Sequence, residues 1–153
     1  MLPERHRGFG FPYVIIIDGG NQSDIYQCVN IARQYGLDED MLRRIVVSRA
    51  FTIYQLVDLI TNELPKVVRR FDKVLIIRDM LHMFIDPQIR IDEARPLIKE
   101  ITNSRIFSRN MSVIVSLSRV PSQYKMLFPS FDRCIDVRSS NKPAVLMTKM
   151  RTA

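Results

Sequence analysis

Four short apolar runs, separated by stretches with helical spacing, dominate the hydrophobic pattern of this chain. The runs are Tyr13–Ile17, Ile45–Ser48, Val74–Ile77 and Val113–Val115. They are rich in β-branched residues and almost free of polar positions, which is typical of strands covered on both faces in a parallel sheet. Because strand and helix alternate along the chain, the pattern predicts an α/β fold with a mostly parallel sheet.

The first helix is predicted between the first two strands, over residues 25–35. Ser23 or Asp24 offers an N-cap, and Gly36 offers the left-handed residue that ends the helix. The apolar positions at helical spacing are Ile25, Cys28, Val29 and Ala32.

A second helix is predicted after the N-cap Thr52, with an apolar stripe that extends to Leu64. Pro65 is expected to bend or end this helix, because proline lacks an amide hydrogen and its ring clashes with the preceding turn. A third helix, with Ile98 on its apolar side, is predicted after the loop 86–90.

The C-terminal part of the pattern predicts a different arrangement, because only a short loop joins its two strands. Cys134–Val137 and Ala144–Met147 flank Ser139–Pro143, and this spacing predicts an antiparallel hairpin. Residues 1–12 are predicted to form an irregular N-terminal arm, and residues 13–153 to form one domain.

The two cysteines, Cys28 and Cys134, lie inside apolar patterns and not in a paired framework. We expect both to be buried free thiols, as in a reducing compartment. The longest apolar run, Tyr13–Ile17, is far shorter than the roughly 20 residues that span a bilayer, and no export signal is visible. The sequence therefore predicts a cytoplasmic protein with no membrane partner.

Composition adds positive charge to this picture. The 153 residues include 23 lysines and arginines against 16 acidic residues, a net charge of +7, and 17 of the cations are arginines. Arginine favours planar, bidentate recognition of phosphate or carboxylate groups, which indicates a nucleic acid or an acidic protein as partner. The alternative is a basic surface that only keeps the domain in solution.

The residues that follow the apolar runs are the candidates for chemistry, because ligands of open parallel sheets bind outside the carboxyl ends of the strands. Asp18 and Asp79 follow two runs and could together hold a magnesium ion; the alternative is that Asp18 only caps backbone amides of its own turn. His6, His82 and the two cysteines have no metal-binding spacing, so we expect no metal site. His82 stands among apolar residues and is expected in or just below the surface of the core.

A phosphate-binding loop is absent from the sequence. Such a loop needs the motif Gly-x-x-x-x-Gly-Lys-Ser/Thr, because backbone amides must approach the phosphates and a lysine must reach the outer ones. The glycines are Gly8, Gly10, Gly19, Gly20 and Gly36, and none precedes a lysine. We therefore expect no catalytic residue and no nucleotide cofactor.

Three segments carry a family resemblance. Residues 15–26 contain Ile-Ile-Ile-Asp-Gly-Gly, residues 32–38 contain Ala-Arg-Gln-Tyr-Gly-Leu, and residues 47–56 contain Arg-Ala-Phe-Thr. In combination they resemble the archaeal and eukaryotic branch of the RecA-like recombinases, RadA and its paralogs. The resemblance covers about residues 13 to 150, and it implies that residues 13–153 are a truncated RecA-like domain with a three-layer core.

The same resemblance implies a nucleotide site that lacks the phosphate loop and the acidic residues of the family's site. The family's phosphate loop lies upstream of the first matching segment, so the part that holds ATP is expected to be missing. Gly20 stands where the family usually has an acidic residue, and Arg78 stands where it has a magnesium-orienting aspartate, with Asp79 displaced by one position. Each change removes negative charge from a metal–triphosphate site. Together with Asp18, these positions predict a degenerate site and no ATP hydrolysis.

Two segments match loops in which family members touch single-stranded DNA. The first is 84–95, with Arg90 and Arg95, and the second is 119–132. Cations can follow the phosphates and aromatic rings can stack on bases, each stacked base contributing roughly 1–3 kcal/mol. The alternative is that Leu127 and the aromatic residues of the second segment fold back onto the sheet edge. The candidates in the second segment are Arg119, Tyr124, Lys125 and Phe128.

The resemblance therefore implies a non-catalytic recombinase paralog that assists DNA repair or homologous recombination by binding single-stranded DNA, a RecA/RadA-family partner, or both. The family's Phe-x-x-Ala assembly tether is not evident at Phe9, Phe11, Phe51 or Phe71. One alternative is a protein-interaction module, assembling with itself or in a hetero-complex through apolar surface that the missing strand leaves bare. The other is a nucleotide binder whose phosphate loop comes from a neighbouring subunit, with Arg78 facing the outer phosphate.

Overall fold

The structure, a computed structural model, describes residues 13–20, 25–37, 42–68, 73–107, 112–138 and 143–149. Within these residues one mixed sheet has the strand order β2-β1-β3-β4-β6-β5. The strands that run parallel are β1 (Tyr13–Asp18), β2 (Ile45–Arg49), β3 (Lys73–Arg78) and β4 (Ser112–Leu117). β5 (Arg133–Arg138) and β6 (Pro143–Lys149) form an antiparallel hairpin, and β6 also pairs with β4. The predicted α/β class, with a mostly parallel sheet and a C-terminal hairpin, is confirmed.

Alternate residues of the parallel strands face one side of the sheet and build the core, as the twofold period of a strand requires. Ile17, Ile77 and Val115 stand at the same level in neighbouring strands, and all three are fully buried. They pack against apolar side chains of the helices that cover this face, among them Leu56, Ile60, Ile98 and Ile101.

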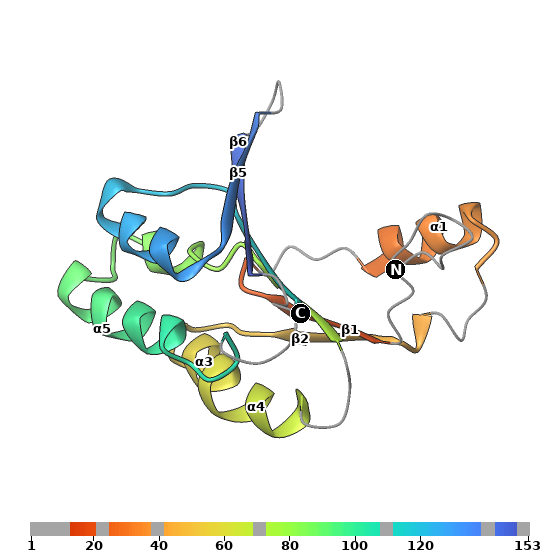
Figure 1. The fold of residues 1–153 in the computed structure, drawn as a ribbon, viewed down its shortest axis with the longest axis horizontal. Coiled ribbons are helices and arrows are strands. Elements are labelled where there is room, and N and C mark those ends of the chain that lie inside the picture. The colour runs from red at the N-terminus through yellow and green to blue at the C-terminus, as the bar shows by residue number, and fades with distance from the viewer. Residues whose placement is uncertain are drawn as a thin grey trace.

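The covering helices are α5 (Ile91–Thr102) and a segment that changes its winding midway (Figure 1). In that segment α3 (Ile53–Asp58) and α4 (Leu64–Val67) are α-helical, and a π-helical turn, η2 (Leu59–Glu63), joins them. Pro65 therefore does not end the helix, which continues for two residues beyond it; Pro65 stands in the first turn of α4, where a missing amide hydrogen is best tolerated. No helix in the described ranges has the length and apolar composition needed to cross a bilayer.

α1 (Ile25–Gln34) lies on the other side of the sheet from α3, α4 and α5 (Figure 1). It ends as predicted: Gly36 has a φ of 62°, and the amides of Gly36 and Leu37 donate to the carbonyls of Arg33 and Ala32 at 3.0 and 2.9 Å. This pair of bonds is a Schellman motif. The predicted N-cap residues, Ser23 and Asp24, lie outside the described residues, as do the arm 1–12 and the hairpin loop 139–142.

Both cysteines are free thiols, but both are exposed, so the prediction that they are buried is wrong. Ala32 is the one buried side chain among residues 26–34, because this helix does not press its apolar positions onto the sheet. Cys28 is therefore open to solvent. Cys134 lies on β5, which is an edge strand of the sheet among the described residues.

Candidate functional site

The parallel strands end at one edge of the sheet with a set of polar residues. Asp18 ends β1, Arg49 ends β2 and Arg78 ends β3, and in the register of the sheet Asp18 stands opposite both arginines. The Asp18 side chain is fully buried, and its Oδ2 lies 3.6 Å from Nε of Arg49. One buried carboxylate therefore stands between two arginines at this edge.

Asp79 directly follows β3, and its hydrogen bonds connect the end of β3 to the end of β4. Its φ is 47°, a left-handed conformation that is uncommon for residues other than glycine. Its carboxylate accepts hydrogen bonds from the Ser118 amide at 3.0 Å and from the Ser118 hydroxyl, which lies 2.8 and 2.7 Å from the two oxygens. The Asp79 amide donates to Oγ of Ser116 at 3.1 Å. These bonds hold the strained backbone in place, and they commit the Asp79 carboxylate to Ser118.

His82 lies beside Asp79 and not in the core, contrary to expectation. Its Nδ1 is 3.6 Å from Oδ2 of Asp79, and its side chain is 48% exposed. In the turn that follows β3, Met80 and Leu81 are the buried residues. The imidazole of His82 therefore lies at the surface.

The glycines after β1 let its end lie directly against residues 78–80. A Cβ on Gly19 would lie 3.1 Å from the carbonyl oxygen of Arg78, and a Cβ on Gly20 would lie 3.2 Å from Cβ of Asp79. The Gly19 amide donates to the Arg78 carbonyl at 2.9 Å. The structure thus brings together the residues predicted as degenerate nucleotide-site positions: Asp18, Gly20, Arg78 and Asp79. Among the described residues, no three acidic, histidine or cysteine side chains are grouped so that they could hold a metal ion.

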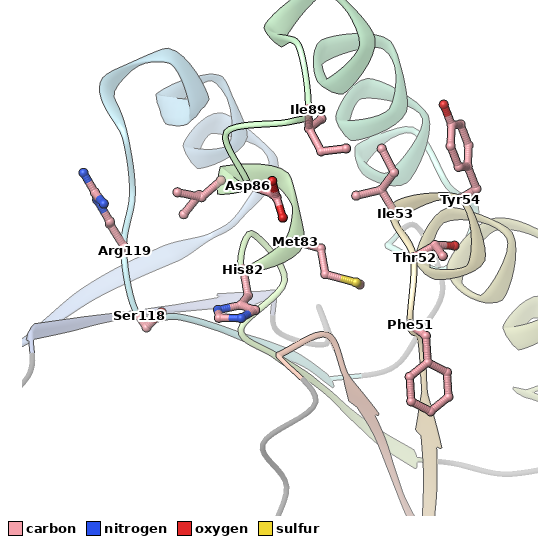
Figure 2. Close-up of a pocket in the computed structure, with 11 residues that line it drawn as sticks. Phe51, Thr52, Ile53, Tyr54, His82, Met83, Asp86, Ile89, Ser118 and Arg119 are labelled. Atoms are coloured by element: carbon pink, nitrogen blue, oxygen red, sulfur yellow. The ribbon is translucent and has the colours of Figure 1, made fainter.

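An open groove of about 720 Å³ lies beside this edge of the sheet (Figure 2). Residues 51–54, at the start of α3, form one wall, and residues 82–89, which include the short helix η4 (Met83–Ile85), form the other. Ser118 and Arg119 lie beyond the second wall. The walls contribute four non-aromatic apolar side chains to the lining: Ile53, Met83, Ile85 and Ile89.

The first predicted DNA-binding segment, 84–95, is only partly a loop. α5 begins at Ile91, so Arg95 lies in a helix and not in an irregular segment. Arg90 precedes this helix, and its Nη2 lies 3.4 Å from Oδ2 of Asp92. Both arginines are exposed.

In the second predicted segment, 119–132, the structure agrees with the alternative interpretation: Tyr124 and Leu127 fold back and are buried. The segment forms a 3₁₀ helix, η5 (Ser122–Ser130). Tyr124 is only 2% exposed, and its hydroxyl donates to the Phe84 carbonyl at 2.8 Å. Burial raises the pKa of Tyr124, and the positive charge of Arg95 partly opposes this rise. The Tyr124 ring is therefore part of the core and is not open to a base.

The cations of the same segment remain at the surface. Arg119 and Lys125 are exposed, and neither makes a hydrogen bond or ion pair with another residue in the described ranges. Phe128 is half-buried against the core. Of the four candidates in this segment, Arg119 and Lys125 keep the exposure that phosphate binding requires.

Two aromatic residues of the groove were not singled out as site residues from the sequence. Phe51 is 69% exposed and Tyr54 is 58% exposed, and both line the groove. Tyr54 donates its hydroxyl hydrogen to Oε1 of Glu93, and this bond raises the pKa of Tyr54. One feature of the sequence could have indicated Phe51 as a site residue: it lies between the end of a strand and the N-cap Thr52 of the next helix.

Comparison with known proteins does not assign the chain to a family. No protein-family model and no curated protein matches it. The similarity to RecA-like recombinases therefore depends on the three sequence segments described above.

Proposed function

We propose that this chain is a non-catalytic RecA/RadA-like recombinase paralog that assists DNA repair or homologous recombination by binding single-stranded DNA, a partner recombinase, or both. The observation that carries the proposal is the charge at the carboxyl edge of the sheet, where Asp18 stands between Arg49 and Arg78. By resemblance this edge would face a metal–triphosphate group. Because Asp18 balances one of the two arginines, the edge keeps one excess positive charge, which favours an anion over a metal cation.

The state of Asp79 supports the non-catalytic part of the proposal. A carboxylate that positions a magnesium ion must offer its oxygens to the metal or to metal-bound water. The Asp79 carboxylate instead accepts hydrogen bonds from the amide and the hydroxyl of Ser118, which hold it against that residue. The neighbouring Arg78 adds a positive charge where hydrolysis of a metal-bound triphosphate needs a negative one.

The arrangement of layers agrees with a RecA-like core at the level of the α/β class. α1 lies on one side of the sheet, and α3, α4 and α5 lie on the other (Figure 1). The exposed cations suited to a DNA backbone are on segments that follow β3 and β4: Arg90, Arg95, Arg119 and Lys125.

DNA binding is tested by fluorescence anisotropy with a labelled oligothymidine at low salt. Arg119→Ala is expected to weaken binding several-fold, because a phosphate contact is lost. Lys99→Ala is the matched control, since Lys99 is an exposed cation in the last turn of α5, and it is expected to bind as the wild type does. Absence of wild-type binding, or equal losses in both variants, contradicts the DNA-binding proposal.

The non-catalytic proposal is tested by adding ATP and Mg²⁺ to the purified protein. We expect no release of inorganic phosphate. We also expect an unchanged midpoint of thermal unfolding, since a ligand that binds the folded state would raise it. Phosphate release that disappears in Asp79→Asn contradicts this proposal.

A protein-interaction module is the second candidate, and the surface of α1 and the turn after it favour it. Tyr26, Ile31 and Tyr35 are 81%, 50% and 49% exposed, and exposed apolar groups are frequent at protein interfaces. This candidate predicts that the sedimentation coefficient rises with protein concentration and that Ile31→Ser reduces the rise. A sedimentation coefficient independent of concentration contradicts self-assembly through this surface.

A further inference from the structure

We infer that β5 is the contact through which two copies of this chain associate, with the β5 strands of the two copies paired antiparallel. The inference goes beyond the proposed function, because it names a surface and a partner that DNA binding does not involve. It also differs from the second candidate above, which places self-association on α1. Pairing of the two β5 strands joins the sheets of the two copies into one.

β5 is an edge strand among the described residues, and both of its faces are open to solvent. Its six residues pair with β6 in one continuous register, from Arg133 opposite Thr148 to Arg138 opposite Pro143. Successive side chains of a strand point to opposite faces, yet every residue from 132 to 136 is exposed, and Ile135 is 50% exposed. Figure 1 shows the β5–β6 hairpin extending beyond the helices that cover the sheet. The helices therefore leave this strand accessible to another chain.

The sequence of β5 does not carry the features that usually keep an edge strand from pairing with another chain. Such features are proline, a bulge, a very short strand and repeated lysines. Residues 133–138 include no proline, glycine or lysine, and their unbroken register with β6 contains no bulge. An edge strand presents backbone amides and carbonyls with which a strand of another chain can pair. β5 is therefore suited to the addition of a strand.

β2, at the opposite end of the sheet, is less accessible than β5. Ile45, Val47 and Ser48 are half-buried, and only Val46 and Arg49 of its five residues are exposed. Of the two end strands in the described ranges, β5 is thus the one that another chain can approach over its whole length.

A second copy fits this strand because β5 is compatible with its own sequence in the reverse direction. Directly opposite residues of an antiparallel pair lie on the same face, so in a twofold pair one residue stands opposite itself. If that residue is Ile135, two apolar side chains meet at the centre, and such cross-strand pairs stabilise a sheet. The other opposite positions join unlike charges or include a neutral residue: Arg133 with Val137, Cys134 with Asp136, and Asp132 with Arg138.

The registers on either side bring like charges together. A pair centred on Arg133 or on Asp136 places that charge opposite its own copy. A pair centred on Cys134 places Asp132 opposite Asp136. Like charges directly opposite each other destabilise a sheet, so these registers are less favourable than the one about Ile135.

A register centred on Val137 pairs opposite charges but little of the strand. It sets Asp136 opposite Arg138, and residues 133–135 then face positions outside β5. The register about Ile135 pairs all of β5 without a like-charge contact. One pair of strands is a small contact beside the roughly 1,200–2,000 Å² of a stable interface, so we expect a dimer that forms only as the protein concentration rises.

Sedimentation equilibrium of the full chain measures this association. The mass is expected to rise with concentration from the 17.9 kDa of one chain toward that of two. Ile135→Lys is expected to weaken the dimer about tenfold, because two lysines then face each other in place of two apolar side chains. Circular dichroism checks that this variant unfolds near the wild-type temperature, as expected for a side chain that is half exposed.

Val46→Lys is the matched control, because Val46 is an apolar residue of the opposite end strand with a similar exposure of 48%. It is expected to associate as the wild type does. Ile31→Ser, which alters the α1 surface, is also expected to associate as the wild type does.

Engineered cysteines test the register. In a Cys28→Ser and Cys134→Ser background, Ile135→Cys places two thiols on directly opposite residues, whose Cα atoms are about 4.5–5.5 Å apart. This separation is within the range of a disulfide. With oxidised glutathione as the oxidant, we expect a covalent dimer on non-reducing electrophoresis. Arg133→Cys in the same background is the control, since residue 133 lies on the same face but opposite residue 137, and it is expected to remain a monomer.

The outcomes decide the inference without bearing on DNA binding. A mass of one chain at every concentration overturns it. Equal weakening by Ile135→Lys and Val46→Lys, or weakening by Ile31→Ser in place of Ile135→Lys, assigns the association to another surface and also overturns it. If Ile135→Lys does not fold, the disulfides decide: a covalent dimer from Ile135→Cys and not from Arg133→Cys supports the β5 contact, and any other pattern contradicts it.

Discussion

Tyr124 ties two segments at the carboxyl end of the sheet together through one buried hydroxyl. Its hydroxyl donates to the Phe84 carbonyl at 2.8 Å, and the two side chains are 2% and 1% exposed. The bond joins η5 to the segment that precedes α5. Tyr124 thus stabilises the protein beside the groove and does not bind a ligand there.

Removing this hydroxyl tests its structural role. Tyr124→Phe is expected to lower the free energy of unfolding by about 1 kcal/mol, because the buried Phe84 carbonyl loses its donor. Urea unfolding measures the loss. The affinity for oligothymidine is expected to stay at the wild-type value, and a weakened affinity would show that the Tyr124 hydroxyl acts in binding.

The buried phenol also predicts a dependence of stability on alkaline pH. Burial raises the pKa of Tyr124 and Arg95 partly opposes it, so the folded state keeps this proton to a higher pH than the unfolded state. Stability is then full below the ordinary tyrosine pKa of about 10 and falls as the pH rises through the raised value. Unfolding free energies measured across this range should fall more steeply for the wild type than for Tyr124→Phe. Parallel curves would contradict the assignment.

The β1 strand end depends on a close approach that only glycine permits. A Cβ on Gly19 would lie 3.1 and 3.2 Å from the carbonyl oxygens of Arg78 and Asp79, and these atoms belong to a backbone that hydrogen bonds hold in place. Gly19→Ala is therefore expected to lower the free energy of unfolding by about 1–3 kcal/mol, measured by urea unfolding. A wild-type midpoint in this variant would show that the two strand ends separate easily.

The start of α3 is stabilised by a side-chain cap. Thr52 Oγ1 accepts from the Gln55 amide, so Thr52→Ala is expected to lower the free energy of unfolding by about 1 kcal/mol. Thr52→Ser retains the cap and should restore the free energy of unfolding; failure of the serine to do so contradicts the capping role.

Most elements could be predicted from the sequence, because alternation and helical spacing depend on neighbours along the chain. The strand ends, the hairpin and the left-handed Gly36 are of this kind. Helical spacing on α1 does not reveal whether anything covers it, and the exposure of Cys28 was missed for that reason. The burial of Tyr124 depends on Phe84, a residue 40 positions away, and no local pattern contains that contact.

At the scale of the whole molecule, the net charge of +7 indicated an anionic partner, but its distribution depends on the fold. The sheet register places Arg49 and Arg78 on either side of Asp18. This arrangement depends on β1 lying between β2 and β3, and the sequence alone does not give that strand order. The groove could not be predicted, since it forms between segments about residues 52, 85 and 118 of the chain. Phe51 is exposed, although phenylalanine is among the residue types most often fully buried.

The salt dependence of wild-type binding to oligothymidine tests the central claim most directly. If the carboxyl end of the sheet and its flanking cations bind phosphates, log affinity falls linearly with log salt concentration, by about 0.7 for each phosphate contact. The Arg119→Ala line should then be shallower by about that amount. An affinity that does not change with salt, or no binding at the lowest salt concentration, would contradict the account.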